Sequence, residues 1–134
     1  MANLTSHDLR PCYFSTTVTG NRFVSLENVI TSAGIISVIP AISGSIPEGV
    51  VLTTMTASTT GKYIHQYGGA IVELEVVGAI TAGMLLMPIA GGKAKVAAQY
   101  TTTTPVYPGA VALEDCASVS LCKARLIQPY RIDA

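Results

Sequence analysis

Charged side chains are scarce in this chain. They make up 12% of its 134 residues, and the formal net charge is zero. An average soluble domain carries about twice that share. Because a phosphate-binding surface needs clustered Lys and Arg, this composition argues against a nucleic-acid partner. So few charges also give little repulsion between copies, and we therefore expect oligomerisation or docking onto another protein.

Long unbroken apolar runs are also missing, although apolar residues make up 49% of the chain. Residues 29–47 carry no charge, but Gly34, Pro40 and Gly44 interrupt them. A membrane-spanning helix needs about 20 mainly apolar residues in continuous sequence. The first residues lack the basic start and apolar run of a signal peptide. We therefore expect neither a membrane span nor a secretory signal.

Cysteine is rare, and its spacing is uninformative. The three cysteines are Cys12, Cys116 and Cys122, and no C-x-x-C occurs. An odd number without a secretory signal indicates reduced thiols. Cys116 and Cys122 have no histidine near them, which argues against a zinc site. We expect all three to act as small hydrophobic side chains.

The groups that an enzyme of this size needs are few. The histidines are His7 and His65, and His65 lies between Ile64 and Gln66 in a predicted strand, where a hydrogen-bonded or exposed histidine is favoured over a catalytic base. There is no G-x-S-x-G and no phosphate-binding motif. Glu73 and Glu75 would share one solvated face, which does not separate their pKa values as acid–base catalysis requires. We expect no enzymatic activity, no cofactor and no metal.

Strand-forming residues recur in short runs that turn residues interrupt about every ten positions, as in a sandwich or barrel. Residues 72–76 show the alternation of a half-buried strand most clearly. The predicted fold is all-β, a small β-barrel or compact β-sandwich, with at most one short helix that Leu113-Glu114-Asp115 would start. Turns are expected at Gly20-Asn21, Gly61-Lys62, Gly68-Gly69 and Gly91-Gly92. The predicted strands cover residues 14–18, 22–26, 35–39, 50–55, 63–67, 72–76, 85–89, 94–98, 110–113 and 122–126.

Two predicted strands carry opposite charges on their outer faces. If they are neighbours, Glu73 and Glu75 could pair with Lys123 and Arg125, each pair contributing roughly 0.2–1 kcal/mol. Two unrelated solvated faces are the alternative.

Two segments resemble each other. Residues 49–58 align with residues 109–118 through a G-x-V start and an A-S end, and a proline lies just before each. This suggests a repeated strand–turn–strand unit. Around it, residues 1–22 are predicted to be an extended N-terminal arm, residues 23–127 a β domain, and residues 128–134 a short C-terminal tail.

A family resemblance runs through the middle of the chain. The sequence GAIVELEVVGAITAGMLLM (residues 69–87), then GGKA (residues 91–94), resembles a signature of tailed-phage capsid decoration, or cement, proteins. That small β family was formerly labelled a domain of unknown function. GAVALEDCA (residues 109–117) is similar to its second motif, and PEGVVLT (residues 47–53) to an earlier turn.

The resemblance implies a structural virion protein. Such a protein is made in the host cytoplasm, binds the outer surface of the assembled major capsid protein shell, and stabilises it by bridging neighbouring subunits. A homo-oligomer is expected, with a trimer favoured over a dimer. The alternatives are another virion module (a head fibre base, neck or tail component) and a small ligand-binding barrel that uses His65 and Cys116.

The N-terminal arm then becomes the candidate contact with the partner. An extended segment can add to a strand edge of a capsid subunit or of another copy. The candidate contact residues are Leu4, Leu9, Arg10, Tyr13 and Phe14.

Overall fold

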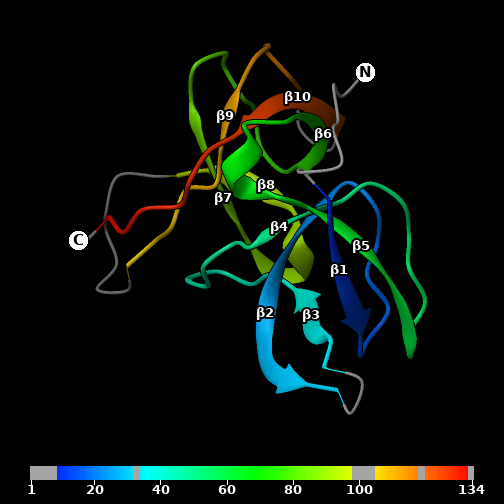
Figure 1. Ribbon diagram of the computed structural model, residues 1–134. Helices are drawn as coiled ribbons and strands as arrows, with labels where there is room; N and C mark the ends of the chain where they lie inside the picture. Colours follow the sequence, from blue (N-terminus) through cyan, green and yellow to red (C-terminus); the bar gives the residue numbers. More distant parts are fainter. Residues whose placement is uncertain (1–8, 32–33, 98–104, 118–119, 133–134) are drawn as a thin grey trace.

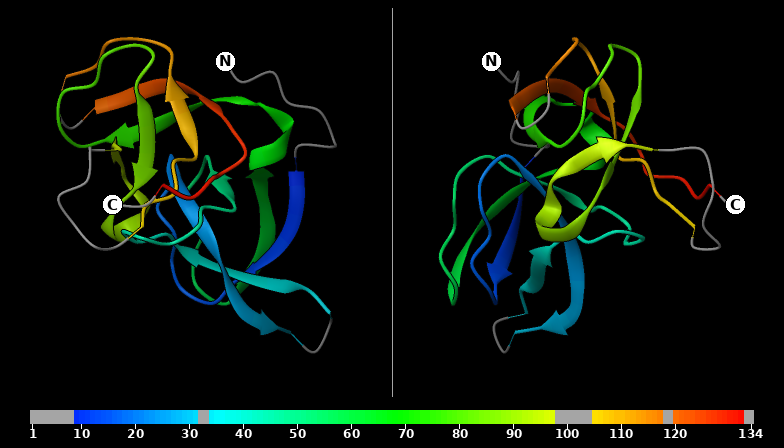
Figure 2. Two further views of the ribbon diagram at one scale, coloured as in Figure 1. Left: turned by 90° about the vertical axis from the view of Figure 1, so that its left-hand side faces the viewer. Right: turned by 180° about the vertical axis from the view of Figure 1, so that it is seen from behind.

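The chain folds into two β-barrels. The computed structural model describes residues 9–31, 34–97, 105–117 and 120–132. Within these residues, ten strands form two closed barrels of five strands each. The first barrel occupies the lower part of Figure 1 and the second the upper part, and Figure 2 gives two further sides. The all-β prediction is therefore confirmed, and a barrel is the form that it takes.

The first barrel has the strand order β1-β3-β2-β4-β5, closed by pairing of β1 with β5. Strands β1 and β3 are parallel, and its other neighbours are antiparallel. Its strands are β1 (Leu9–Phe14), β2 (Arg22–Ile30), β3 (Ile36–Pro40), β4 (Gly49–Val51) and β5 (Thr59–His65). A short 3-10 helix, η1 (Gln66–Gly68), follows β5.

The second barrel has the strand order β10-β6-β8-β7-β9. Its one parallel pair among the described strands is β6 with β8. Its strands are β6 (Ile71–Val76), β7 (Leu85–Pro88), β8 (Ala94–Val96), β9 (Ala110–Ala112) and β10 (Ser120–Leu126). The short 3-10 helix η2 (Ala90–Gly92) links β7 to β8.

The second barrel repeats the topology of the first, strand for strand. If β1 to β5 correspond in order to β6 to β10, every pairing and every direction in one barrel recurs in the other. The register recurs too: Phe14 pairs with Thr59 in β5, and Val76 pairs with Ser120 in β10. The chain thus contains an internal structural duplication, and the repeat that the sequence predicts is one part of this duplication.

The irregular connections are also duplicated. An isolated antiparallel bridge joins Val18 to Met55 in the first barrel and Ile80 to Cys116 in the second. After each bridge comes a residue with positive φ, Asn21 (62°) or Gly83 (90°). The Asn21 N–H donates to the Val51 carbonyl, and the Gly83 N–H to the Ala112 carbonyl. Such matching turns make a chance likeness of two barrels a poor explanation.

The repeat had been aligned one residue out of register. The sequence comparison set Gly49 against Gly109, but Gly49 pairs with His65 in β5 while Ala110 pairs with Leu126 in β10. Gly49 is therefore equivalent to Ala110. The shared G-x-V letters therefore fall on positions that are shifted by one residue between the two copies.

The hydrophobic core runs through both barrels. Phe23 and Val50 of the first barrel belong to one buried cluster together with Leu74, Leu86 and other residues of the second. A second cluster, which includes Cys12 and Phe14, fills the far end of the first barrel. The continuous cluster means that neither barrel is packed by its own residues alone.

The predicted N-terminal arm is wrong for its described part. Residues 9–14 form β1, which closes the first barrel against β5, and Cys12 and Phe14 are completely buried in it. Pro11 is tolerated because β3 pairs only with Tyr13 and Phe14, so its missing N–H breaks no bond on that side. Residues 1–8 lie outside the described residues. The single domain predicted for residues 23–127 is likewise replaced by two barrels, the first of which begins at Leu9.

Two local expectations also need correction. Gly61 and Lys62 lie inside β5 and form no turn. Glycine is needed at position 61 for another reason, since a side chain there would collide with Met55 and Phe14. Leu113, Glu114 and Asp115 start no helix, and the described residues contain η1 and η2 where at most one short helix was expected. Turns at Gly69 and at Gly91-Gly92 are confirmed, since all three glycines have positive φ.

The predicted C-terminal tail is held to the second half of the chain. Ile132 and Val106 form an antiparallel bridge with hydrogen bonds of 2.9 and 3.1 Å. Among the described residues, no helix has the length and apolar character to cross a membrane.

Candidate functional site

The residues proposed to contact a partner lie in β1 and belong to the barrel itself. Phe14 is completely buried, and Leu9 packs against the core that both barrels share. Tyr13 is half-buried and Arg10 is exposed. Leu4 lies outside the described residues. Phe14 therefore cannot act as a contact residue, because the core already covers it, and Arg10 is the predicted contact with the most open side chain.

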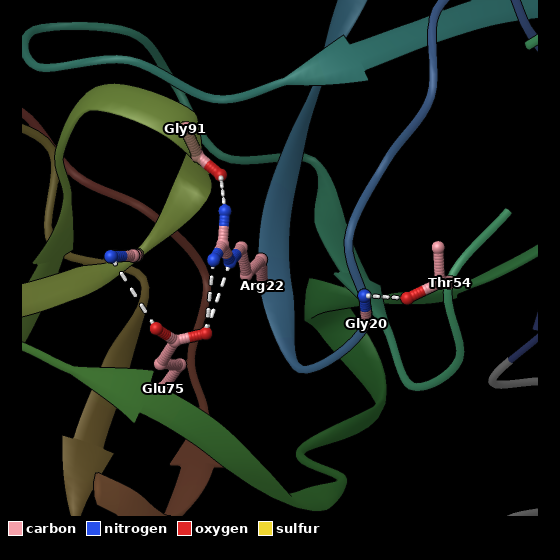
Figure 3. Close-up of polar contacts among 6 residues, drawn as sticks. Gly20, Arg22, Thr54, Glu75 and Gly91 are labelled. Carbon is pink, nitrogen blue, oxygen red and sulfur yellow. Dashed lines mark hydrogen bonds and ion pairs between the residues drawn. The ribbon is translucent and has the colours of Figure 1, made fainter. Parts of the chain in front are cut away.

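An ion-pair cluster joins the two barrels at the start of β2. The Arg22 guanidinium donates to the Glu75 carboxylate of β6 at 3.1 and 3.2 Å, and to the Gly91 carbonyl of η2 at 3.4 Å. The Lys93 ammonium lies 3.4 Å from the other Glu75 oxygen. Figure 3 shows Arg22 between Gly91 and Glu75, with the first barrel's own contact of Gly20 with Thr54 beside it. The Glu75 side chain thus bonds to Arg22 across the junction and to Lys93 of its own barrel, although its strand pairs with β10.

The charge of Glu75 is fixed by this cluster. Partial desolvation raises the pKa of the Glu75 carboxyl, but hydrogen bonds and charges from Arg22 and Lys93 outweigh it and hold that pKa below 4.5. The prediction that the strand of Glu73 and Glu75 lies beside the strand of Lys123 is confirmed, since β6 pairs with β10 and Glu73 pairs with Lys123 in register. The ion pairs of Glu75, however, were assigned to the wrong partners.

Backbone contacts make the junction between the barrels close. The Glu75 N–H donates to the Asn21 carbonyl at 2.9 Å, and the Asn21 amide donates to the Glu73 carbonyl at 3.0 Å. At the other side, the buried Gln66 amide donates to the carbonyls of Gly109 at 2.5 Å and Ile127 at 2.8 Å. These bonds, all from the first barrel to the second or the reverse, hold both barrels as one body.

A second polar cluster surrounds His65 at the end of β5. Its Nε2 lies 3.1 Å from the Glu48 carboxylate, and its Nδ1 accepts from the Tyr67 N–H at 3.2 Å, so the proton is on Nε2. The Tyr63 hydroxyl donates to the same Glu48 oxygen at 2.8 Å. Burial lowers the pKa of His65, and the nearby Arg10 charge adds to this, against an opposing effect of Glu48.

These hydrogen bonds and the burial of the ring explain His65 as a structural residue, with no need for a catalytic role. The His65 side chain is 7% exposed, and both of its ring nitrogens have protein partners. The prediction of a hydrogen-bonded strand histidine is confirmed, with the addition that it is buried. Cys116, the other residue of the ligand-binding alternative, lies in the second barrel, so the two residues do not line a common barrel interior.

An apolar groove opens beside this cluster. A cavity of about 300 Å³ is lined by Ser25, Leu26, Ser45, Ile46 and Glu48. Leu26 is 41% and Ile46 57% exposed, and the neighbouring Ile42 is 58% exposed. We call this surface, defined by Leu26, Ile42 and Ile46, the apolar groove. Large apolar side chains gathered at one exposed place are typical of a protein-binding surface.

The cysteines divide between the two barrels. Cys12 is completely buried in the first barrel, and burial raises the pKa of its thiol to about 11. Cys122 is also completely buried, and its pKa is raised to about 12 by burial and by the neighbouring Cys116, Glu114 and Asp115. Cys116 is half-buried beside it. Sequence reasoning missed this neighbourhood because it sought a histidine near Cys116 and Cys122 and did not consider the Glu114 carboxylate, which lies beside both sulfurs.

Glu48, Arg22 and the apolar groove were also absent from the sequence prediction. Arg22 gave no signal, since an arginine at the start of a strand is ordinary. Glu48 could have been noticed, because it lies in the PEGVVLT stretch that resembles a family turn.

Fold and junction together define the class: an all-β protein of two duplicated five-stranded barrels joined by a polar junction. One solved structure that is similar to this chain is the head fiber gp8.5 N base of bacteriophage phi29. It matches with a TM-score of 0.69 and 15% sequence identity, over 100% of each chain. A scan against models of protein families found no match, and a search of curated proteins found none. Membership of the decoration-protein family therefore stays a prediction.

Proposed function

We propose that this protein is a structural component of a phage virion that attaches to the outside of the head. The observation that carries the proposal is the likeness to the phi29 head fiber base, which extends over the whole of both chains. A match of one barrel would say little, since small barrels serve many functions. A match of two barrels in tandem is more demanding, because their relative placement has to agree as well.

The physical character of the molecule supports a mechanical role. The junction around Arg22 and Glu75 and the core shared by both barrels give one stiff body. His65, the histidine among the described residues, is buried, and its two ring nitrogens bond to Glu48 and Tyr67. We therefore propose a binding protein and not an enzyme, whose partner is the major capsid protein.

Two finer roles remain to be distinguished. A base that anchors a head fibre is favoured by the solved structure, and a cement protein that bridges capsid subunits is favoured by the sequence motifs around residues 69–87. Both roles need a surface that fits the capsid, and both gain strength from repeated copies. For either role we propose a homo-oligomer, with a trimer favoured.

We propose the apolar groove as the contact with the capsid. Ile42 and Ile46 are well exposed at the edge of the cavity, and the one ionisable group that lines it, Glu48, is engaged by His65 and Tyr63. Such a surface can be desolvated at little electrostatic cost, as the centre of a protein interface requires.

Cryo-electron microscopy of virions assembled with and without the protein tests the proposal. We expect extra density on the outer head surface only when the protein is present. Density in regular positions over the whole shell would identify a cement protein, and density at the foot of a fibre would identify a fibre base. Density at the neck or tail, or none on the virion, would contradict a head-attached function.

A pair of variants tests the groove. Ile46→Glu should reduce the number of bound copies at least about tenfold, because it places a charge in a desolvated contact. Tyr130→Glu is the matched control, since Tyr130 is 46% exposed and lies outside the groove. Equal binding by both variants would exclude the groove while leaving the virion assignment intact.

A further inference from the structure

Three potential metal ligands meet in the second barrel, between β9 and β10. Cys122 is buried in β10, Cys116 lies in the bridge to Ile80, and Glu114 is exposed just before it. The two thiol sulfurs and a Glu114 carboxylate oxygen all lie within 4.8 Å of one another. Cys116 Sγ is 3.8 Å from Glu114 Oε2. All three residues belong to one short stretch of the chain that connects β9 to β10 and begins β10.

We propose that Glu114, Cys116 and Cys122 form a binding site for a thiophilic divalent cation of the zinc class. Zinc binds thiolate sulfur at about 2.3 Å and carboxylate oxygen at about 2.0–2.2 Å. Tetrahedral ligands at those distances are about 3.4–3.8 Å apart. Small side-chain rotations therefore suffice to close the group around an ion. Each thiol gives up its proton to solvent when it binds the metal.

The backbone already positions the carboxylate. The Lys123 N–H donates to Glu114 Oε2 at 3.0 Å. Ligating carboxylates commonly accept such a hydrogen bond, which fixes their orientation. The neighbouring Asp115 is engaged elsewhere, since its carboxylate accepts from the Ala82 N–H at 2.8 Å. Asp115 is therefore not the fourth ligand in this arrangement.

In the first barrel, the positions equivalent to the three proposed ligands carry other types of residue. Glu114, Cys116 and Cys122 are equivalent to Thr53, Met55 and Gly61, as the paired bridges and strand registers show. In the first barrel an apolar group occupies this place. The Met55 methyl carbon lies 2.7 Å from the position that a Cβ on Gly61 would take. Met55 thus fills the space that Cys122 fills in the second barrel.

This internal comparison separates the ligands from the needs of the fold. In the first copy a methionine packs beside a glycine at these positions, and the barrel still closes. Closure therefore does not require the two cysteines and the glutamate of the second copy. All three differences in the second copy replace a poor zinc ligand by a good one. Three protein ligands also leave a fourth position open, and the exposure of Glu114 lets water or a partner side chain reach it.

Cobalt binding tests the site on the full chain. The protein is reduced, freed of metal with a chelator, and checked for three titratable thiols before Co²⁺ is added. We expect one Co²⁺ per chain, with the thiolate-to-cobalt charge-transfer absorption and the visible bands of tetrahedral cobalt, and displacement by Zn²⁺. Cys122→Ala and Cys116→Met, which installs the first barrel's residue, should abolish the spectrum. Glu114→Thr should weaken the affinity at least about tenfold.

Cys12→Ala is the matched control, because it removes a buried cysteine of the other barrel and should leave the spectrum unchanged. Far-ultraviolet circular dichroism verifies that each variant is folded. As a second measurement, saturating Zn²⁺ should raise the Tm of the wild-type chain and not that of Cys116→Met. No charge-transfer band in the reduced wild-type protein, or a band that survives Cys116→Met, would overturn the proposal.

Discussion

At the scale of single residues, Gly92 shows how closely the barrels approach. It lies in the second barrel with φ of +83°, a conformation that L side chains rarely adopt. A Cβ there would also collide with the Phe23 carbonyl of the first barrel and lie 3.2 Å from the Arg22 side chain. Gly92 thus meets a conformational and a steric requirement at once.

A pair of substitutions separates these two requirements. Gly83 also has positive φ, at +90°, but no heavy atom lies within 4 Å of an added Cβ. Gly83→Ala should cost about 1–2 kcal/mol from conformation alone. Gly92→Ala should cost more than about 3 kcal/mol, because the junction must shift as well. The measurement is chemical denaturation, and equal losses would show that the barrels do not press on each other at Gly92.

At the scale of elements, the junction depends on features that the repeat does not share. Arg22 begins β2, and its equivalent is the exposed Met84, the residue just before β7. Arg22 is therefore specific to the first copy, where it reaches Glu75 of β6.

A double-mutant cycle measures this contact. Arg22→Met, which installs the second copy's residue, and Glu75→Gln should show a coupling of about 1–2 kcal/mol, since both side chains are at least three-quarters covered, at 19% and 25% exposed. The coupling should fall at acidic pH. The pKa of Glu75 is depressed in the folded protein, so its contribution is present above about pH 4.5 and is lost as pH drops through the folded pKa. Coupling near zero at neutral pH would contradict the assignment.

At the scale of the whole molecule, the two barrels should unfold together. The buried cluster that joins Phe23 and Val50 to Leu74 and Leu86 would be opened if either barrel unfolded alone. Calorimetry should therefore give one transition, with equal calorimetric and van't Hoff enthalpies. Two separated transitions would mean that the barrels are independent domains, and the stiff body proposed for attachment to a phage head would lose its support.

The sequence by itself determined the elements. Alternation and turn residues located a segment for each strand, usually within a few residues, because period and turn chemistry are local. The main displacement was at β1, where the expected strand began at Phe14 but the structure has Leu9–Phe14. Arg10 and Pro11 concealed that strand, because a proline is acceptable in a strand only where one of its two sides lacks a pairing strand, and β3 does not reach Pro11.

Only the tertiary structure decided what the elements build. Closure into two barrels and the pairing of Arg22 with Glu75 join residues far apart in the sequence, and the meeting of Glu114, Cys116 and Cys122 depends on how the chain bends between β9 and β10. Local propensity carries no information on which strand pairs with which, and the letters shared by the two copies were too few to fix their register. The duplication became visible once hydrogen-bond register, which depends on the folded backbone, could be compared between the copies.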